Sequence, residues 1–415
     1  MDNFPTFNIK YTIDNANIFT EMQSSPNNQY NTKVELATRL FSDGTISVEE
    51  ASHITGHHPQ QLKNYFEAKG IIPKKRILVC GGAGFMGSYF IKYMLKKHPH
   101  IWIVNYDKLS YAGNLNNLNE TEADERYTFI RGDITDKEHL EKIIQRFKID
   151  YLVNFAAESH VDRSILKATD FIKSNIEGVH ILLEVVTQFK IPFIQISTDE
   201  VFGEVENGKF TEEHPFRPNN PYSASKAAGD LLCRAYYVTH QTPVIVTHSC
   251  NVMGSHQFPE KLIPGFIIRL LNSQKVTVHG DGRNIREWIY VEDHSRAIEF
   301  IMKNGLPGRV YNIGTGYEKS NMEITELILD KLGKNRTFVD YVPQRKGNDW
   351  RYALDTSRLN EMGWKPVFAF DDSLNYIVNW YANNKWWWEP ILSGEHEQKL
   401  KKPYHSAYRE DGEIA

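Results

Sequence analysis

A phenol and an amine stand four residues apart near the middle of the chain, at Tyr222 and Lys226. The run Tyr-Ser-Ala-Ser-Lys follows a Pro- and Asn-rich loop and is expected to open a helix, which places both side chains on one helical face. A tyrosine hydroxyl has a pKa near ~10 and acts as a base near neutrality only where a positive charge stabilises the phenolate. Lys226 can supply that charge, so the pair is a candidate proton-transfer device. The competing interpretation is a packed tyrosine followed by a solvated lysine.

Two adjacent acids, Asp199 and Glu200, follow the apolar run 192–196. The run predicts a buried parallel strand, which delivers Thr198 and both acids at its carboxyl end. Open α/β sheets place their active sites at such ends. Burial beside a like charge raises one of two carboxyl pKa values, so one acid of the pair is expected to stay protonated. The alternative is a solvated strand end.

Three glycines, Gly81, Gly84 and Gly87, stand between an apolar strand at 77–80 and a helix at 88–97. Tight turns also use glycine, but the order of strand, turn and helix is typical of dinucleotide sites. In such sites the pyrophosphate rests on the N–H groups of the helix start. We therefore expect a bound dinucleotide.

The choice between NAD and NADP depends on Asp107, which ends the second strand twenty residues after Gly87. A carboxylate at that place accepts hydrogen bonds from the ribose hydroxyls and repels a 2′-phosphate. The neighbouring Lys108 weakens this preference. The sequence predicts NAD.

Two further strand ends carry residues that suit the same cofactor. Asp133 and Ile134 follow the third strand, on the expected adenine side, although they also fit a simple strand-ending turn. Ala156 and Ala157 end the fourth, and their small side chains let a cofactor approach the backbone closely. The expected cofactor contacts are Gly81, Gly84, Phe85, Met86, Gly87, Asp107, Asp133, Ile134, Ala156, Ala157, Tyr222 and Lys226.

Length and composition set the class of protein. With 415 residues and a formal net charge of −4, the chain can bury a sizeable core and gives no reason to expect nucleic acid or an acidic membrane surface as a partner. The absence of a long apolar run and of a signal-peptide pattern predicts a cytoplasmic protein. The spacing of Cys80, Cys233 and Cys250 suits neither a disulfide framework nor a zinc site, so no metal is expected.

The N-terminal part has a character of its own. Residues 1–31 are rich in Asn and Ser and are expected to form a flexible tail, and 32–73 to form three short helices. Ser47 and Glu50 have the spacing of a capping box. The last two helices also suit a helix-turn-helix. Because the third helix offers little positive charge to phosphates, a docking or oligomerisation module is favoured over DNA binding.

Nine motifs in order carry a family resemblance: GGAGFMGS, NYDKLSYAGNLNNL, GDITD, NFAAESHVDRSI, STDEVFGE, NPYSASKAAGD, HQFPEKLIP, GDGRNIREWIYVEDH and YNIGTG. They resemble the extended short-chain dehydrogenase/reductase superfamily and, within it, the nucleotide-sugar 4,6-dehydratases, closest to the dTDP-glucose members. The resemblance implies an α/β fold, a Rossmann-type doubly wound parallel sheet with a smaller C-terminal substrate-binding lobe, over 74–390. The helical extension at 32–73 and a polar tail at 391–415 lie outside it.

The resemblance also implies a reaction. Such an enzyme oxidises the sugar at C4 with NAD, eliminates water across C5 and C6, and returns the hydride to C6. It implies Tyr222 as the base at the C4 hydroxyl, Glu200 as the base at C5 and Asp199 as the acid for the leaving hydroxyl. The catalytic set is then Thr198, Asp199, Glu200, Tyr222 and Lys226.

Three other functions stay open. A C4 epimerase and a decarboxylase acting on UDP-sugars share the fold, but the Asp-Glu pair is typical of the dehydratases. A non-catalytic NAD-responsive regulator has no need of a complete proton-transfer set. The nucleotide base, thymine or uracil, is not determined by the sequence, since a methyl-sized difference is worth only ~1–3 kcal/mol.

The substrate side is also implied by the family pattern. A polar stretch after the fourth strand includes His160 and Asp162, which are expected to orient one another. Met253 and Ser255 depart from the family pattern and are expected to alter the nicotinamide and sugar end of the pocket. The resemblance implies a homodimer that pairs two long helices per subunit, one of them at 222–239. The expected substrate contacts are His160, Asn251, Lys261, Leu262, Arg286, Asn321 and Arg351.

Overall fold

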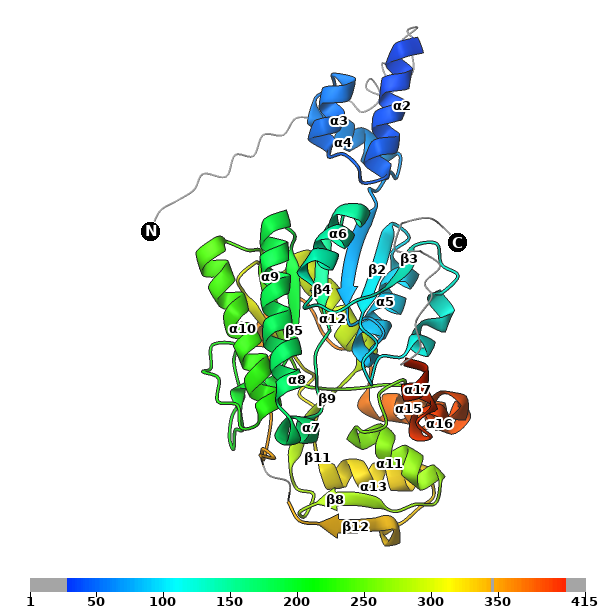
Figure 1. The fold of residues 1–415 in the computed structure, drawn as a ribbon, viewed down its shortest axis with the longest axis vertical. Helices are drawn as coiled ribbons and strands as arrows, with labels where there is room; N and C mark the ends of the chain where they lie inside the picture. The colour runs from blue at the N-terminus through cyan, green and yellow to red at the C-terminus, as the bar shows by residue number, and fades with distance from the viewer. Residues whose placement is uncertain (1–27, 345–346, 401–415) are drawn as a thin grey trace. The chain divides into compact units, whose positions relative to one another are not determined.

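The computed structural model describes residues 28–344 and 347–400 (Figure 1). The chain divides into two compact units, with the division between Lys75 and Arg76. Most of the predicted tail at 1–31 lies outside the described residues, and a helix begins within it at residue 28. Each unit is described by itself.

The first unit contains the three predicted helices, α2 (Asn28–Ser42), α3 (Val48–Thr55) and α4 (Pro59–Ala68). The predicted capping box is confirmed. The Ser47 hydroxyl accepts a hydrogen bond from the Glu50 amide, and the Glu50 carboxylate accepts one from the Ser47 amide. The three helices enclose a small core of Ala37, Phe41, Ala51, Leu62 and Phe66.

A seven-stranded sheet organises the second unit, in the order β10-β6-β5-β4-β1-β2-β3. The pairs β1–β4, β4–β5, β5–β6, β6–β10 and β2–β3 are all parallel. The strands are β1 (Lys75–Cys80), β2 (Ile101–Asp107), β3 (Tyr127–Arg131), β4 (Tyr151–Asn154), β5 (Phe193–Thr198), β6 (Val244–Ser249) and β10 (Val310–Ile313). The predicted parallel sheet is confirmed.

Helices cover both faces of this sheet (Figure 1). In β1, Ile77 and Val79 belong to one buried cluster and Leu78 to another, because successive side chains of a strand point to opposite faces. Burial on both faces is what the continuous apolar strand runs indicate. The helices are α5 (Phe85–Lys97) and α12 (Val291–Asn304) on the first face, and α6 (Lys137–Phe147), α9 (Gly178–Phe189) and α10 (Pro221–His240) on the second.

The strand order reverses between β1 and β4. From β1 the chain proceeds outward through β2 and β3, and from β4 it proceeds the other way through β5 and β6. The connections leave the sheet in opposite directions at this point, so a crevice opens beyond the carboxyl ends of the strands. This is where the sequence predicts the cofactor.

Smaller sheets and further helices form the C-terminal lobe. Its strands are arranged as β11-β9-β7 and β12-β8. The strands are β7 (Asn251–Met253), β8 (Val276–His279), β9 (Ile285–Tyr290), β11 (Glu318–Ser320) and β12 (Val339–Val342), and the helices include α11 (Leu262–Leu271), α13 (Asn321–Lys331), α15 (Phe370–Asn383), α16 (Lys385–Leu392) and α17 (Glu395–Leu400). Within the described residues, no helix is long and apolar enough to cross a membrane.

Candidate active site

Two adjoining cavities lie over the carboxyl ends of the strands. The first has a volume of about 310 Å³ and the second about 80 Å³. Gly81, Gly84, Phe155 and Ala157 line both, so the two form one continuous site. Its shape suits an elongated ligand that runs from β2 across the switch point to β5.

The glycine turn after β1 is built for close approach. Gly81 has φ +77°, and a Cβ atom there would lie 2.4 Å from the Ala156 nitrogen. A Cβ at Gly87 would lie 2.4 Å from the Gly81 oxygen. Gly84 is the N-cap of α5 and has no side chain to cap the helix, and Gly84, Phe85, Met86 and Gly87 all line the larger cavity. This arrangement suits a pyrophosphate.

Asp107 lies in the smaller cavity at the end of β2. Its carboxylate accepts hydrogen bonds from the amides of Ala83 (2.9 Å) and Leu109 (2.8 Å). Burial raises the pKa of Asp107, and these two hydrogen bonds oppose the rise. Each oxygen keeps capacity for a further donor, as the ribose hydroxyls of an adenosine would provide.

Of the remaining predicted cofactor contacts on the adenosine side, three line the smaller cavity and one does not. Ile134, Ala156 and Ala157 line the smaller cavity. Asp133 does not belong to the described lining, and its carboxylate instead accepts a hydrogen bond from the Thr135 amide at 3.1 Å. Tyr106 and Ser174 line this cavity and were not predicted.

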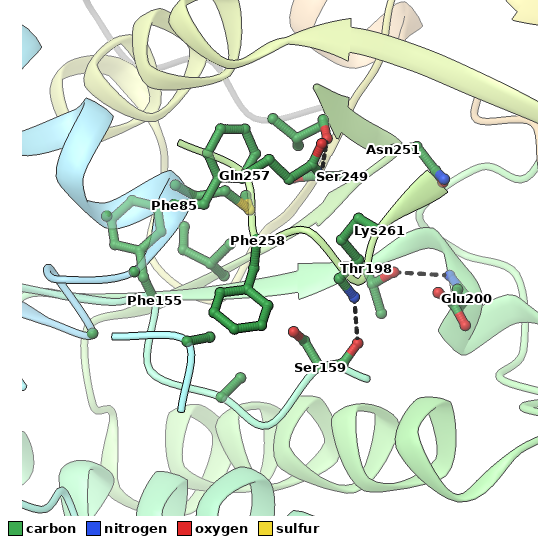
Figure 2. A pocket seen from close by; sticks show the side chains of 18 of the residues that line it. Phe85, Phe155, Ser159, Thr198, Glu200, Ser249, Asn251, Gln257, Phe258 and Lys261 are labelled. Carbon is green, nitrogen blue, oxygen red and sulfur yellow. Dashed lines mark hydrogen bonds between the residues drawn. The ribbon is translucent and has the colours of Figure 1, made fainter. Parts of the chain in front are cut away.

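The end of β5 turns directly into a short 3₁₀ helix, Asp199–Phe202. The Thr198 side chain caps it by accepting a hydrogen bond from the Glu200 amide at 3.3 Å (Figure 2). The Glu200 carboxylate accepts a hydrogen bond from the Ser223 hydroxyl at 3.0 Å. Thr198, Asp199 and Glu200 all line the larger cavity, as the sequence predicts.

Asp199 has the surroundings of a carboxylic acid. It is 1% exposed, and one oxygen, Oδ1, accepts a hydrogen bond from the Thr198 hydroxyl at 3.2 Å. The other oxygen, Oδ2, has no hydrogen-bond partner among the described residues. Burial and then the charge of Glu200 raise the pKa of Asp199 well above its usual range. An acid in this state can donate a proton into the cavity.

Tyr222 and Lys226 lie on one face of α10 and both line the larger cavity. The N-cap Asn220 fixes the helix start, because its side chain accepts a hydrogen bond from the Ser223 amide at 2.9 Å. Burial and the charge of Glu200 raise the pKa of Tyr222, and a hydrogen bond with Thr198 opposes the rise.

The Lys226 ammonium group donates to the Ile196 carbonyl at 2.6 Å. Burial lowers its pKa, and the charge of Asp230 opposes that change. The sequence analysis did not identify Asp230, which lies one turn further along α10.

The opposite wall of the cavity is the segment 256–263. The Lys261 ammonium group donates to the Ser159 carbonyl at 2.8 Å, and the Phe258 ring lies beside them (Figure 2). Asn251 and Leu262 also line this cavity. Ser159 and Phe258 were missed as site residues although both lie within quoted motifs.

Four predicted substrate contacts lie outside the described cavity linings. His160 accepts a hydrogen bond from the Arg163 amide at 3.3 Å, and its other ring nitrogen lies 3.4 Å from the Glu260 carboxylate. Glu260, which lines the larger cavity and which the sequence analysis missed, is therefore a partner of the His160 ring. The expected mutual orientation of His160 and Asp162 stays a prediction.

The two arginines are engaged elsewhere. Arg351 forms a bidentate ion pair with the Glu318 carboxylate, with N–O distances of 2.6 and 2.9 Å. Arg286 is buried, donates to backbone carbonyls such as that of Asp349 (3.0 Å), and lies 4.2 Å above the Tyr352 ring. The backbone of Asn321 donates to Asn284 at the start of α13. Their roles in binding stay predictions.

The two family departures also lie behind the cavity rather than in its lining. Met253 is 1% exposed, and Ser255 forms a short hydrogen bond with Tyr89. The prediction that they shape the sugar end of the pocket is therefore not supported by direct contact. In the described ranges no group of three His, Cys, Asp or Glu side chains could hold a metal ion.

Comparisons with known proteins agree with this geometry. The family model described as GDP-mannose 4,6 dehydratase matches residues 78–376. The low-salt glycan biosynthesis protein Agl12 of Haloferax volcanii is 46% identical over 309 residues, 74% of this chain and 99% of the relative. A dTDP-glucose 4,6-dehydratase of Actinoplanes sp. is 44% identical over 320 residues, 75% of this chain and 99% of the relative. The crystal structure of dTDP-glucose 4,6-dehydratase from Bacillus anthracis in complex with NAD is 42% identical, with a TM-score of 0.72, and the match covers 76% of this chain and 99% of that one.

Proposed function

The chain belongs to the GDP-mannose 4,6-dehydratase family, and from this premise we propose that it converts dTDP-glucose to dTDP-4-keto-6-deoxyglucose. It is an NAD-dependent nucleotide-sugar 4,6-dehydratase, a lyase of the short-chain dehydrogenase/reductase type. The single observation that carries the reaction type is Asp199, a buried acid beside Glu200 in the cavity that also contains Tyr222, with one oxygen that has no partner among the described residues.

The described residues fit NAD. The Gly81 turn leaves space that a Cβ would fill, the start of α5 presents amides for a pyrophosphate, and Asp107 is placed for the adenosine ribose. When bound, NAD would supply the hydride chemistry, by accepting a hydride from C4 of the sugar and returning it to C6. The protein itself holds and moves the protons.

Tyr222 is the proposed base at the C4 hydroxyl. Its pKa is raised by burial, so it needs a nearby cation to lose its proton. Lys226, on the same face of α10, supplies that charge, and Thr198 steadies the phenol by its hydrogen bond.

Glu200 is the proposed base at C5 and Asp199 the acid at the C6 hydroxyl. The Ser223 hydroxyl orients Glu200, and burial keeps Asp199 protonated until the hydroxyl leaves. The two acids are adjacent in the chain, so a single strand end supplies both sides of the elimination. A C4 epimerase has no elimination and does not need this pair, so that alternative is less well supported.

The nucleotide sugar is proposed to lie between β5 and the segment 256–263, with Asn251, Lys261 and Leu262 as contacts. Thymine as the nucleotide base is supported by the names of the relatives, which are dTDP-glucose 4,6-dehydratases, and a UDP-sugar substrate is the alternative. We also propose that His160, Arg286, Asn321 and Arg351 contact the substrate when it is bound.

The function is tested by separating oxidation from elimination. Tyr222→Phe should abolish both product formation and nicotinamide absorbance on addition of dTDP-glucose. Asp199→Asn combined with Glu200→Gln should still develop nicotinamide absorbance but lose product by about 10²–10⁴-fold for each group. Parallel reactions with UDP-glucose and UDP-N-acetylglucosamine, with mass detection of water loss, identify the nucleotide base of the substrate. Near-wild-type dehydration by the double variant would refute the assigned roles.

The assembly and location are proposals too. A homodimer that uses α10 as one of its interface helices is supported by two exposed apolar side chains on one face of α10, Leu231 (55% exposed) and Val238 (63% exposed). We further propose that 32–73 acts as a docking or oligomerisation module and that the enzyme is cytoplasmic.

A further inference from the structure

The cavity wall at 256–263 is held from behind by two helices near the end of the catalytic unit, α15 and α16. The Tyr381 hydroxyl donates to the Gln257 carbonyl at 2.6 Å. The centroid of the His256 ring lies 4.3 Å from that of the Trp380 ring and 5.5 Å from that of the Trp387 ring, and the His256 and Trp387 rings meet edge to face. His256 has φ +61°, an unusual backbone conformation for a residue other than glycine, so these ring contacts help to keep the segment in place.

Trp387 also reaches the cofactor turn. Its indole N–H donates to the Asn117 side-chain oxygen at 2.8 Å. The Asn117 side-chain nitrogen in turn donates to the Ala83 carbonyl at 3.0 Å. Ala83 stands between Gly81 and Gly84 in the glycine turn, and its amide is the one that binds Asp107.

The two sets of contacts meet in a single side chain. Trp387 is 1% exposed, Asn117 is 1% exposed, and neither belongs to the described lining of the two cavities. A rigid indole packed at interior density transmits a shift of one neighbour to the other. The neighbours are the wall that supplies Lys261 and the turn that receives the pyrophosphate.

We propose that Trp387 is a positioning residue that couples the nucleotide-sugar wall to the cofactor turn, through His256 on one side and Asn117 on the other. Closing of the wall on a nucleoside diphosphate then favours the geometry of the turn that retains NAD. By linkage, bound NAD favours the closed wall by the same factor. The inference rests on the proposed function for the identity of the two ligands.

The test measures the release of NAD from the holoenzyme with and without dTDP. In the wild-type protein dTDP should slow release by about tenfold, within the usual range of coupling between sites. In Trp387→Phe, which keeps an aromatic ring and removes the indole N–H, dTDP should slow release less than twofold. The KM for the nucleotide sugar should rise several-fold while kcat changes less, because Trp387 touches no reacting atom.

The neighbouring tryptophan supplies the matched control. Trp386 is 51% exposed, and its indole N–H donates to the side-chain oxygen of Asn384, the N-cap residue of α16. Trp386→Phe should keep the wild-type coupling. Asn117→Ala removes the same hydrogen bond from the opposite partner and should abolish the coupling as Trp387→Phe does, so the proposal can be decided even if Trp387→Phe folds poorly.

Three outcomes refute the inference: coupling that persists in both Trp387→Phe and Asn117→Ala, coupling lost equally in Trp386→Phe, or a lower melting temperature with coupling and KM unchanged. If dTDP does not bind, UDP replaces it as the probe. If neither nucleotide binds, the proposed function fails. The part of the inference that concerns NAD alone, bracing of the cofactor turn by Trp387, is then decided by whether Trp387→Phe releases NAD faster than Trp386→Phe does.

Discussion

Asp230→Asn is expected to shift the alkaline limit of activity to lower pH. Asp230 is 4% exposed and lies one turn after Lys226 on α10. Its Oδ2 accepts a hydrogen bond from the Ser197 hydroxyl at 2.6 Å and lies 3.2 Å from the His248 ring nitrogen. Burial lowers the pKa of Lys226, and the charge of Asp230 is the main influence that opposes it.

The size of the effect follows from the helix geometry. The Cβ atoms of residues four apart on a helix are separated by about 5–6 Å, which we take as the scale of the charge separation. Two unit charges at that distance interact by about 3 kcal/mol at an effective dielectric constant of about 20. An interaction of this size is large enough to move a titration measurably, so loss of the Asp230 charge should lower the pKa of Lys226 further below its usual range.

The sign follows from the role of the ammonium group. When Lys226 has a lower pKa, it loses its proton at a lower pH, and Tyr222 then loses the charge that stabilises its phenolate. The pH profile of kcat/KM reports the groups of the substrate-free enzyme. Its alkaline limb should therefore move to lower pH, while the acid limb, which does not depend on Lys226, moves less.

Asp293→Asn is the control, because Asp293 is also a buried aspartate on a helix and pairs with Arg296 far along the chain from Lys226. It should lower stability and leave the alkaline limb in place. The reasoning is refuted if Asp230→Asn has the wild-type alkaline limb, or if the two variants shift it equally.

Three further changes test separate parts of the structure. Gly81→Ala, at φ +77° and with its Cβ 2.4 Å from Ala156, should lose copurifying NAD and about 1–2 kcal/mol of stability, measured by absorbance and urea unfolding. Burial raises the pKa of Glu299, but hydrogen bonds from residues including Lys303 lower it to about 2. The stability that the ionised Glu299 contributes is present above pH ~4.5 and is lost as the pH falls through about 2. In urea titrations, Glu299→Gln should therefore lower the free energy of unfolding by up to about 3 kcal/mol at pH 7 and by almost nothing near pH 2. Val238→Glu should turn a dimeric mass into a monomeric one in light scattering if α10 forms the interface.

Local pattern and order predicted much of the fold. Each strand of the central sheet that the sequence indicated is present, and the glycine turn lies at the switch point, because these features depend on residues close in the chain. Boundaries moved by a few residues. The fourth strand ends at Asn154 instead of continuing to 157, which leaves Ala156 and Ala157 in the turn where they line the cavity.

The partners of side chains could not be predicted in the same way. The ion pair of Arg351 with Glu318, and the link between Trp387 and Asn117, join residues 33 and 270 positions apart. No spacing rule covers such distances, because tertiary packing decides them. Three adjacent tryptophans cannot share one face of a helix, and Trp387 and Trp388 are buried while Trp386 is exposed.

The contact between Trp387 and Asn117 also bears on how the protein is made. Chains emerge from the ribosome with the N-terminal end first, and early segments begin to fold before later ones exist. The cofactor turn and β1 to β4 can form at that stage, but the indole that braces the turn is synthesised 270 residues after its partner. The nascent chain therefore carries an unbraced dinucleotide site for most of its synthesis. Firm retention of NAD should begin only when α16 has left the exit tunnel.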